Sequence, residues 1–355
     1  MNRRHSVAAL IVALAAGLIA STGASAAPAS QPAPVAAPPA AAIAPAPDLA
    51  YGAYQRQDYK TAMSEAKKRL AANPKDAAAM GLIGQLYLEG AGVARDAKLA
   101  LDWFRRAADA GSDSAAYLYG AALLQGMGGV TDRARARAYL EKAAAKDYGA
   151  ALHLLGEMAL ENEGKPSDFA KAAAYFKRAS DAGDADGSYA LAVLYKNGKG
   201  VEKDMRQAGE YFRRAADRDL PAGQVEYAIM LFNGVGVERD RTSAIALLRK
   251  AAAQDNPVAQ NRLAHIYAEG LGVEVNPQEA REWRDRANDA GLKDPSLDYL
   301  NNISVEKKPA DKKPAEKASS ATAPASAGGK PAALDSSAFD APAAAPQPLQ
   351  PPARK

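Results

Sequence analysis

The sequence predicts an all-α fold: a right-handed α/α superhelical solenoid built from helix-turn-helix repeats with a period of 36 residues. Three observations predict this class. Residue types recur at this fixed spacing, each period holds two stretches with helical periodicity, and aromatic residues make up only 6% of the chain. A fixed period in this range is typical of stacked arrays, and an alanine-rich chain with few aromatic residues suits short helices that pack closely.

The period can be followed from Ala100, whose position is alanine in all six periods. Three residues later stands a position that is aromatic in five of the six periods, and four residues earlier stands an aspartate or asparagine. The aromatic position is occupied in turn by Trp103, Tyr139, Tyr175, Tyr211, Leu247 and Trp283. The aspartate or asparagine position is occupied by Asp96, Asp132, Asp168, Asp204, Asp240 and Asn276. Periods without an insertion or deletion between them indicate a tandem array.

Each period consists of a first helix, a loop and a second helix. In the fifth period the first helix is predicted over about 222–232 and the second over about 242–254. Gly234 and Gly236 should end the first helix, because glycine adopts positive φ without a steric cost. Asp240 should cap the second helix, because its carboxylate accepts a free backbone N–H and suits the helix dipole.

The packing of the two helices is predicted from one position that is always small. It is occupied by Gly84, Gly120, Gly156, Ala192, Ala228 and Ala264, so a neighbouring helix should approach closely there. In the second helix, the recurring alanine, the aromatic position and a following alanine pair form one stripe at helical spacing. We expect the large aromatic side chains of this stripe to pack against small residues where the helices meet.

The chain begins with the features of a cleavable signal peptide, predicted for residues 1–26. Two arginines precede an apolar run at 7–20, which is too short for a comfortable membrane span. Ala24-Ser25-Ala26 forms a cleavage pattern, so the mature chain should start at the next residue. The features favour general secretion into a bacterial periplasm or cell envelope, and an uncleaved N-terminal anchor is the alternative.

Low-complexity segments flank the repeats. Residues 27–47 hold seven prolines and no charge and should form an extended linker. Residues 304–355 hold nine prolines together with lysines and alanines and should form a disordered tail. The solenoid is therefore predicted over 48–303, with a cap at 48–77 and six repeats over about 79–291.

Composition and missing motifs argue against several functions. The net charge is +4, but the repeat region has no sustained basic field that would recruit nucleic acid. The chain has no cysteine, which excludes disulfides, thiolate metal sites, cysteine nucleophiles and lipid attachment at a cysteine. Only His153 and His265 lie in the predicted mature fold, and no metal-binding or nucleophile motif occurs. We therefore expect a protein that is not an enzyme and uses no cofactor and no metal.

The pattern of one period resembles a known repeat. Residues 79–93 read Ala-x-x-x-Ile-Gly-x-x-Tyr-x-x-Gly-x-Gly-Val, and an aspartate, an alanine, an aromatic position and an alanine pair follow. This pattern is similar to the Sel1-like repeat. The region from Tyr51 to Asp76 resembles a shorter tetratricopeptide unit, with Asp58 at the start of its second helix, and would cap the array.

The resemblance implies that the first helices line a concave groove that binds a partner. The candidate contact residues, at outward positions of these helices, are Gln85, Glu89, Tyr117, Gln125, His153, Glu157, Tyr189, Asn197, Asn233 and His265. Their amides, carboxylates and aromatic rings suit a bound peptide in extended or helical form. The alternative is that positions such as that of Tyr117 are aromatic only for packing within the array.

Two functions remain open from the sequence. The first is a periplasmic scaffold, adaptor or regulator that binds an envelope protein through the groove. The second is a structural cell-wall or polysaccharide-associated protein, whose Lys/Pro-rich tail lies along anionic peptidoglycan or polysaccharide. Glycan binding in the groove is a third possibility.

Overall fold

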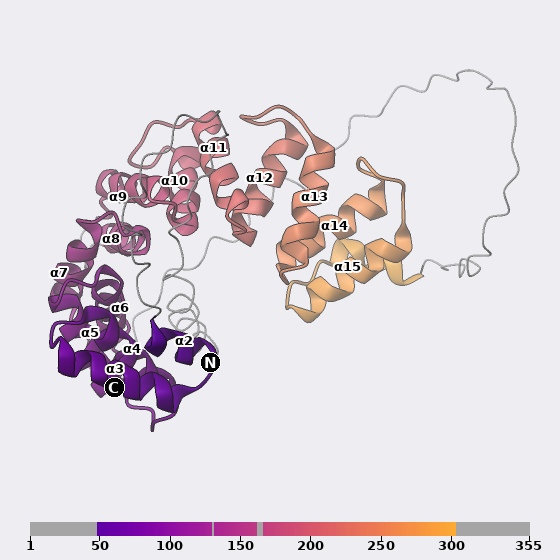
Figure 1. Ribbon diagram of the computed structural model, residues 1–355. Coiled ribbons are helices and arrows are strands. Elements are labelled where there is room, and N and C mark those ends of the chain that lie inside the picture. Colours follow the sequence, from indigo (N-terminus) through magenta and orange to yellow (C-terminus); the bar gives the residue numbers. More distant parts are fainter. Residues whose placement is uncertain (1–47, 130, 162–165, 303–355) are drawn as a thin grey trace, which may run out of the picture. The chain divides into compact units, whose positions relative to one another are not determined.

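The computed structural model describes residues 48–129, 131–161 and 166–302 of the chain. Throughout these residues helices are joined by short loops, and no strand occurs among them (Figure 1). The predicted all-helical class is confirmed. The predictions of a signal peptide at 1–26, a linker at 27–47 and a tail at 304–355 concern residues outside those that the structure describes.

The helices come in pairs, as the period predicts. The cap pair is α2 (Leu49–Gln55) and α3 (Tyr59–Ala72). The following pairs, first helix and then second, are α4 (Ala77–Glu89) and α5 (Ala97–Asp109), α6 (Asp113–Leu124) and α7 (Arg133–Ala144), α8 (Gly149–Glu161) and α9 (Phe169–Asp181), α10 (Ala185–Asn197) and α11 (Met205–Asp217), α12 (Pro221–Asn233) and α13 (Arg241–Ala252), α14 (Pro257–Glu269) and α15 (Pro277–Asp289). Two short 3₁₀ helices, η1 (Met127–Gly129) and η3 (Pro295–Asn302), complete the described elements.

The chain divides into two compact units, and the division runs through α10. The first unit comprises residues up to 191 together with 199–201, and the second comprises 192–198 together with 202 onward. Within each unit the extensive contacts join helices that are consecutive in the chain. In the described part of the chain, no helix is both long enough and apolar enough to cross a lipid bilayer.

The predicted helix caps are present. The Asp240 carboxylate accepts the backbone N–H of Ser243 at 3.0 Å, and the equivalent aspartates and Asn276 cap the other second helices in the same way. In the loop before it, Gly234 ends α12 with φ 72°, in the left-handed region that glycine favours. Gly236 serves a different purpose, because a Cβ there would collide with the backbone carbonyl of Met205 at the start of α11. The glycine pair therefore both ends one helix and lets the loop approach the preceding repeat.

The contact between the two helices of a repeat differs from the prediction by one residue. A Cβ at Gly84 would lie 2.8 Å from the ring of Phe104, and one at Gly120 would lie 2.8 Å from Leu140. The buried partner is thus the residue after the aromatic position, and Phe104 is 2% exposed. Trp103 is only half-buried, with the Arg106 guanidinium 4.1 Å from its ring centre.

Helical geometry explains the shift. Residues four and seven positions after Ala100 share its face, and these are Phe104 and Ala107, both buried. Position 103 lies on the flank of that face, so its ring covers the edge of the first helix instead. Tyr139 shows this arrangement, with its ring edge-on to Tyr119 at 4.7 Å between centroids.

The last repeat is covered by η3. Although the second helix α15 is rich in polar residues, it does not face water alone, because Leu297 and Leu300 of η3 are buried against it. Arg284, which stands at the position of Phe104, is 5% exposed and donates to the backbone carbonyl of Leu297 at 3.1 Å. The polar residue at this position therefore ends the stack by binding the backbone of the final element.

Candidate partner-binding site

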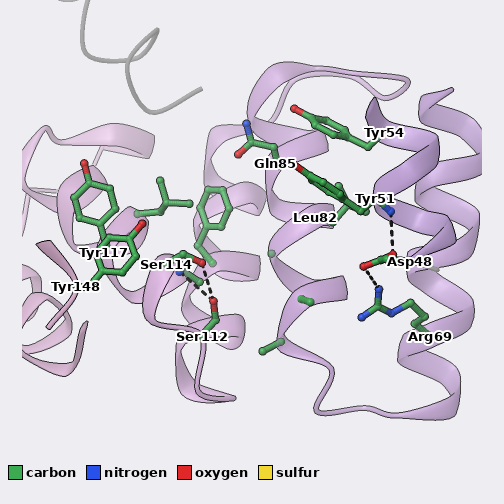
Figure 2. A pocket seen from close by; sticks show the side chains of 16 residues that line it. Asp48, Tyr51, Tyr54, Arg69, Leu82, Gln85, Ser112, Ser114, Tyr117 and Tyr148 are labelled. Atoms are coloured by element: carbon green, nitrogen blue, oxygen red, sulfur yellow. Dashed lines mark hydrogen bonds and ion pairs between the residues drawn. The ribbon is translucent and has the colours of Figure 1, made fainter. Parts of the chain in front are cut away.

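A pocket of about 360 Å³ lies within the first compact unit. Its lining comes mostly from the first helices α4 and α6 and from α2 of the cap pair. Phe104 of α5 and Tyr148, which precedes α8, complete the lining together with Arg69 of α3. The lining is mainly apolar (Figure 2).

Two tyrosine pairs form opposite walls of this pocket. Tyr51 and Tyr54 of α2 have near-parallel rings with centroids 6.1 Å apart, and Tyr117 and Tyr148 have centroids 5.3 Å apart. Figure 2 shows the side chain of Gln85, with Leu82 close by, between the two pairs. The four rings present broad, rigid apolar faces with hydroxyl groups at their edges.

The space between the walls exists because Gly81 has no side chain. The equivalent first-helix position holds Tyr117 in the second repeat and Tyr189 in the fourth. A Cβ at Gly81 would meet no atom within 4 Å, in contrast with the close contacts that Gly84 makes one turn later. One missing side chain in the first repeat thus opens the pocket at a position that other repeats fill.

The polar groups of the pocket centre on Gln85, which is 6% exposed. Its amide nitrogen donates to a carboxylate oxygen of Glu89 at 2.5 Å, and the hydroxyl of Tyr54 donates to the same oxygen at 2.7 Å. Burial and the neighbouring Glu89 both raise the pKa of Tyr54, so its hydroxyl stays protonated. Within the described residues no donor reaches the amide oxygen of Gln85, which leaves one buried acceptor in the lining.

The charged lining residues neutralise each other. Arg69 donates to the Asp48 carboxylate at 2.6 Å and to the Asp76 carboxylate at 2.8 Å. Asp48 and Asp76 also cap α2 and α4. Burial on its own would raise the pKa of Asp76, but the hydrogen bonds from Arg69 and from the backbone of α4 hold it below its usual value. These ion pairs fix the cap pair against the first repeat, and both charged residues of the lining, Asp48 and Arg69, have an oppositely charged partner.

The phenols of Tyr117 and Tyr148 are available as donors. Burial raises the pKa of each to about 12, so both keep their protons at neutral pH. Tyr117 is 6% exposed, which means that most of its ring contributes to packing while its edge borders the pocket.

Three of the predicted contact residues belong to this site. Gln85 and Tyr117 line the pocket, and Glu89 orients Gln85. Tyr51, Tyr54 and Tyr148 also line the pocket but were not among the predicted contact residues. The tyrosines of the cap pair lie outside the repeat, and Tyr148 lies just before a first helix, so repeat position alone does not single them out. The glycine at position 81, where the second and fourth repeats hold a tyrosine, was the signal in the sequence that could have located the pocket.

The other candidates lie elsewhere on the first helices. Gln125 follows α6, Asn197 and Asn233 are the last residues of α10 and α12, and Tyr189 is part of α10. His153 and Glu157 lie one turn apart on α8, with His153 Nε2 3.8 Å from the Glu157 carboxylate. Although the Glu157 side chain is 52% exposed, burial by the surrounding protein raises its pKa.

His265 is held within the chain. Its side chain is 12% exposed, its Nδ1 lies 3.2 Å from the Glu269 carboxylate and its Nε2 lies 2.8 Å from Asp294. Both ring nitrogens are therefore engaged by carboxylates, and the residue connects α14 to the segment that leads into η3. Among the described residues, no group of three histidine, cysteine, aspartate or glutamate side chains is placed to hold a metal ion.

Comparison with known proteins identifies the repeat. The family model described as Sel1 repeat matches six consecutive segments: 77–112, 113–148, 149–184, 185–220, 221–256 and 257–292. No protein with a curated description matches the chain.

Two of the solved structures that share the fold are 28% identical to this chain. One is a protective antigen present in uropathogenic Escherichia coli strains that displays an SLR fold; it is 28% identical, the match covers 69% of this chain and 53% of that one, and the TM-score is 0.61. The other is a Sel1 repeat protein from Oxalobacter formigenes, also 28% identical, with 67% and 94% covered and a TM-score of 0.58. This chain spans about half the length of the Escherichia coli protein. With six matched repeats and a repeat architecture of paired helices, the chain belongs to the Sel1 repeat family, whose fold is a scaffold for protein–protein interaction.

Proposed function

We propose that this protein is an exported scaffold that binds an envelope protein in the pocket between the Tyr51–Tyr54 and Tyr117–Tyr148 pairs. The observation that carries the proposal is the pocket itself, a hollow of about 360 Å³ on the first helices of a fold built for protein interaction. Two of its lining residues are ones that the sequence selected as partner contacts.

The chemistry of the lining suits a protein ligand. Tyrosines supply large contact areas at a small cost in side-chain entropy, and they are enriched among the residues that dominate binding energies. A pocket of this volume accepts a few side chains of a partner, while the hydroxyl and amide groups at its edges fix the orientation of the partner backbone. Binding here needs no large rearrangement, because the cap pair is already fixed by the ion pairs of Arg69.

The cellular location is proposed from the sequence. The basic start, the short apolar run and the small-residue cleavage pattern support export. The partner is therefore sought in the bacterial envelope.

The test is photo-crosslinking in intact bacteria combined with fractionation. A photoreactive amino acid replaces Ser114, which lines the pocket, and in a control variant it replaces Glu141, an exposed residue on the second helix α7. We expect the protein in the periplasmic fraction with Ala27 as its first residue, and one envelope protein crosslinked from position 114 but not from 141.

Two results would contradict the proposal. Identical crosslinks from both positions would show that the pocket does not select the partner. Recovery of cell-wall or polysaccharide fragments that depends on residues 304–355 would favour the structural alternative instead, in which the lysine-containing tail makes the contact.

A further inference from the structure

We propose that the pocket recognises proline-rich chain, and that in the free protein it is occupied by the chain's own residues 27–47. This goes beyond the proposed function, because it assigns both the chemical class of ligand and an occupant within the same chain. The inference rests on the walls of the pocket, its polar groups, its charge and the point at which the proline-rich segment ends.

The walls have the arrangement that proline rings require. Proline-rich segments favour the polyproline II conformation, and proteins bind them in grooves lined by aromatic rings, because a preformed extended helix loses little entropy on binding. Tyr51 and Tyr54 lie at 22° to each other on one wall, and Tyr117 and Tyr148 lie at 33° on the other. Each pair offers flat faces against which a pyrrolidine ring can pack.

The polar groups complement an alanine- and proline-containing backbone. Polyproline II has no internal hydrogen bonds, so its carbonyls need donors from outside, and the protonated phenols of Tyr117 and Tyr148 can supply them. Proline has no N–H, but the alanines between the prolines do. The buried amide oxygen of Gln85, which no donor in the described residues reaches, can accept one of these N–H groups.

The charge balance also favours this segment. Asp48 and Arg69, the charged residues of the lining, form an ion pair with each other at 2.6 Å. Residues 27–47 hold seven prolines and no charged residue. An uncharged apolar segment can therefore enter the pocket without taking a charge of its own out of water.

Connectivity places the segment at the site. It ends at Pro47, and the next residue, Asp48, lines the pocket as the N-cap of α2. Polyproline II rises about 3.1 Å per residue, so the seven residues 41–47 extend for about 20 Å from that edge. A tether of this length raises the local concentration of the segment to the millimolar range, so even weak intrinsic affinity fills the pocket. A partner that uses the same walls then has to displace the segment.

The absence of natural cysteines allows a direct test in the purified chain that starts at Ala27. Cysteine replaces Ala42, Ala44 or Ala46 in turn, each paired with Ser114→Cys in the pocket. A matched control pairs each of the three with Lys98→Cys, at an exposed position on α5 that does not line the pocket. Disulfide formation with diamide is followed by mass spectrometry. We expect at least one pair that includes Ser114→Cys to form its disulfide about tenfold faster than the matched pair with Lys98→Cys. Docking of the segment in the pocket raises the rate above the rate that tethering alone gives.

A second variant guards against accidental proximity. Gly81→Tyr places in the pocket the side chain that the second and fourth repeats carry at this position. It should lower the rate of disulfide formation to that of the control while the temperature of thermal unfolding stays unchanged.

The proposal is overturned if all pairs with Ser114→Cys form their disulfide at the control rate in the parent. It is also overturned if the crosslinks join two chains, which would identify a second copy as occupant. Faster closure of Ser114→Cys with Ala345→Cys than with any linker position would assign the site to the C-terminal tail. No partner is present in this experiment, so its failure leaves the proposed function standing.

Discussion

At the scale of single residues, glycines on the first helices have opposite effects on packing. Gly84 and Gly120 are small because a large side chain from the second helix packs directly on them. Gly81 is one turn before Gly84 on the same helix, yet nothing fills the space beside it. The first kind of glycine closes the core of a repeat, and the second opens the pocket.

This difference predicts opposite effects of the same substitution. Gly81→Ala should raise the free energy of unfolding by about 0.5–1 kcal/mol, because alanine favours the helix and meets no neighbour. Gly120→Ala should lower it by about 1–3 kcal/mol, because the added methyl group overlaps Leu140. Chemical denaturation of both variants measures the effect, and equal shifts in the same direction would contradict the packing described here.

The one-residue shift in the buried stripe gives a second comparison. Phe104→Ala should destabilise by about 3–5 kcal/mol, since a fully buried ring leaves a cavity against Gly84. Trp103→Ala should cost only about 1–2 kcal/mol, since its ring is half-buried on the flank. The denaturation midpoints of the two variants measure these losses. A larger loss of stability for Trp103→Ala would mean that the aromatic position is the main contact between the helices, as expected from the sequence.

At the scale of elements, hydrogen bonds at helix ends define where each element begins. Second helices begin at capping aspartates, and α12, α14 and α15 each have proline near their first position. The segment leading into η3 is held by Asp294, which accepts from Asn261 at 3.0 Å, from His265 at 2.8 Å and from Ser296. Burial alone would raise the pKa of Asp294, but the hydrogen bonds together hold it well below its usual value.

Replacing this carboxylate should loosen the end of the array in a pH-dependent way. Asp294→Asn should lower stability by about 1–2 kcal/mol at neutral pH, because an amide replaces a charged acceptor. The folded-state pKa lies below that of the unfolded chain, so the contribution is complete above about pH 4 and is lost as the pH falls through the folded-state value. Urea denaturation from pH 7 to pH 3 should show a difference between the variant and the parent that is constant down to about pH 4 and smaller at pH 3. A constant difference over this range would exclude the ionised carboxylate as the cause.

The sequence determined the elements more fully than the site. The period, the aspartate caps and the glycine pairs follow from local backbone chemistry, which is why the helix pairs could be predicted from spacing alone. The side chain packed on Gly84 could not be fixed as clearly, because positions 103 and 104 are both large and apolar. The pocket depends on contacts between the cap pair, the first repeat and the second repeat, and Tyr51 and Tyr148 come together with Gln85 only in three dimensions.

At the scale of the whole molecule, the family membership and the contact pattern describe a modular array. Extensive contacts join consecutive helices within each compact unit, so each repeat depends mainly on its neighbours. The two ends differ from the middle: the cap pair carries the ion pairs of Arg69, and η3 covers α15. Modularity of this kind means that stability and binding can be altered in separate places.

Modularity predicts that a whole repeat can be removed. Deleting 221–256, one complete Sel1 repeat, joins Leu220 to Pro257 and so keeps the Leu-Pro junction that Leu220 forms with Pro221 in the parent. The shortened chain should keep its helical content per residue and unfold cooperatively, because α14 presents the same face as α12. Deleting only 221–238 should abolish cooperative unfolding. Circular dichroism measures both chains, and equal behaviour of the two deletions would contradict a repeat-by-repeat architecture.

The most direct measurement compares Gly81→Tyr with Gly81→Ala in the photo-crosslinking experiment at position 114. Alanine leaves the pocket open and tyrosine fills it, while neither side chain meets an atom at its Cβ. Capture of the envelope partner should be unchanged with alanine and should fall about tenfold or more with tyrosine, as expected when a central binding pocket is lost. Undiminished capture by a Gly81→Tyr protein that unfolds at the same temperature as the parent would show that the partner binds elsewhere.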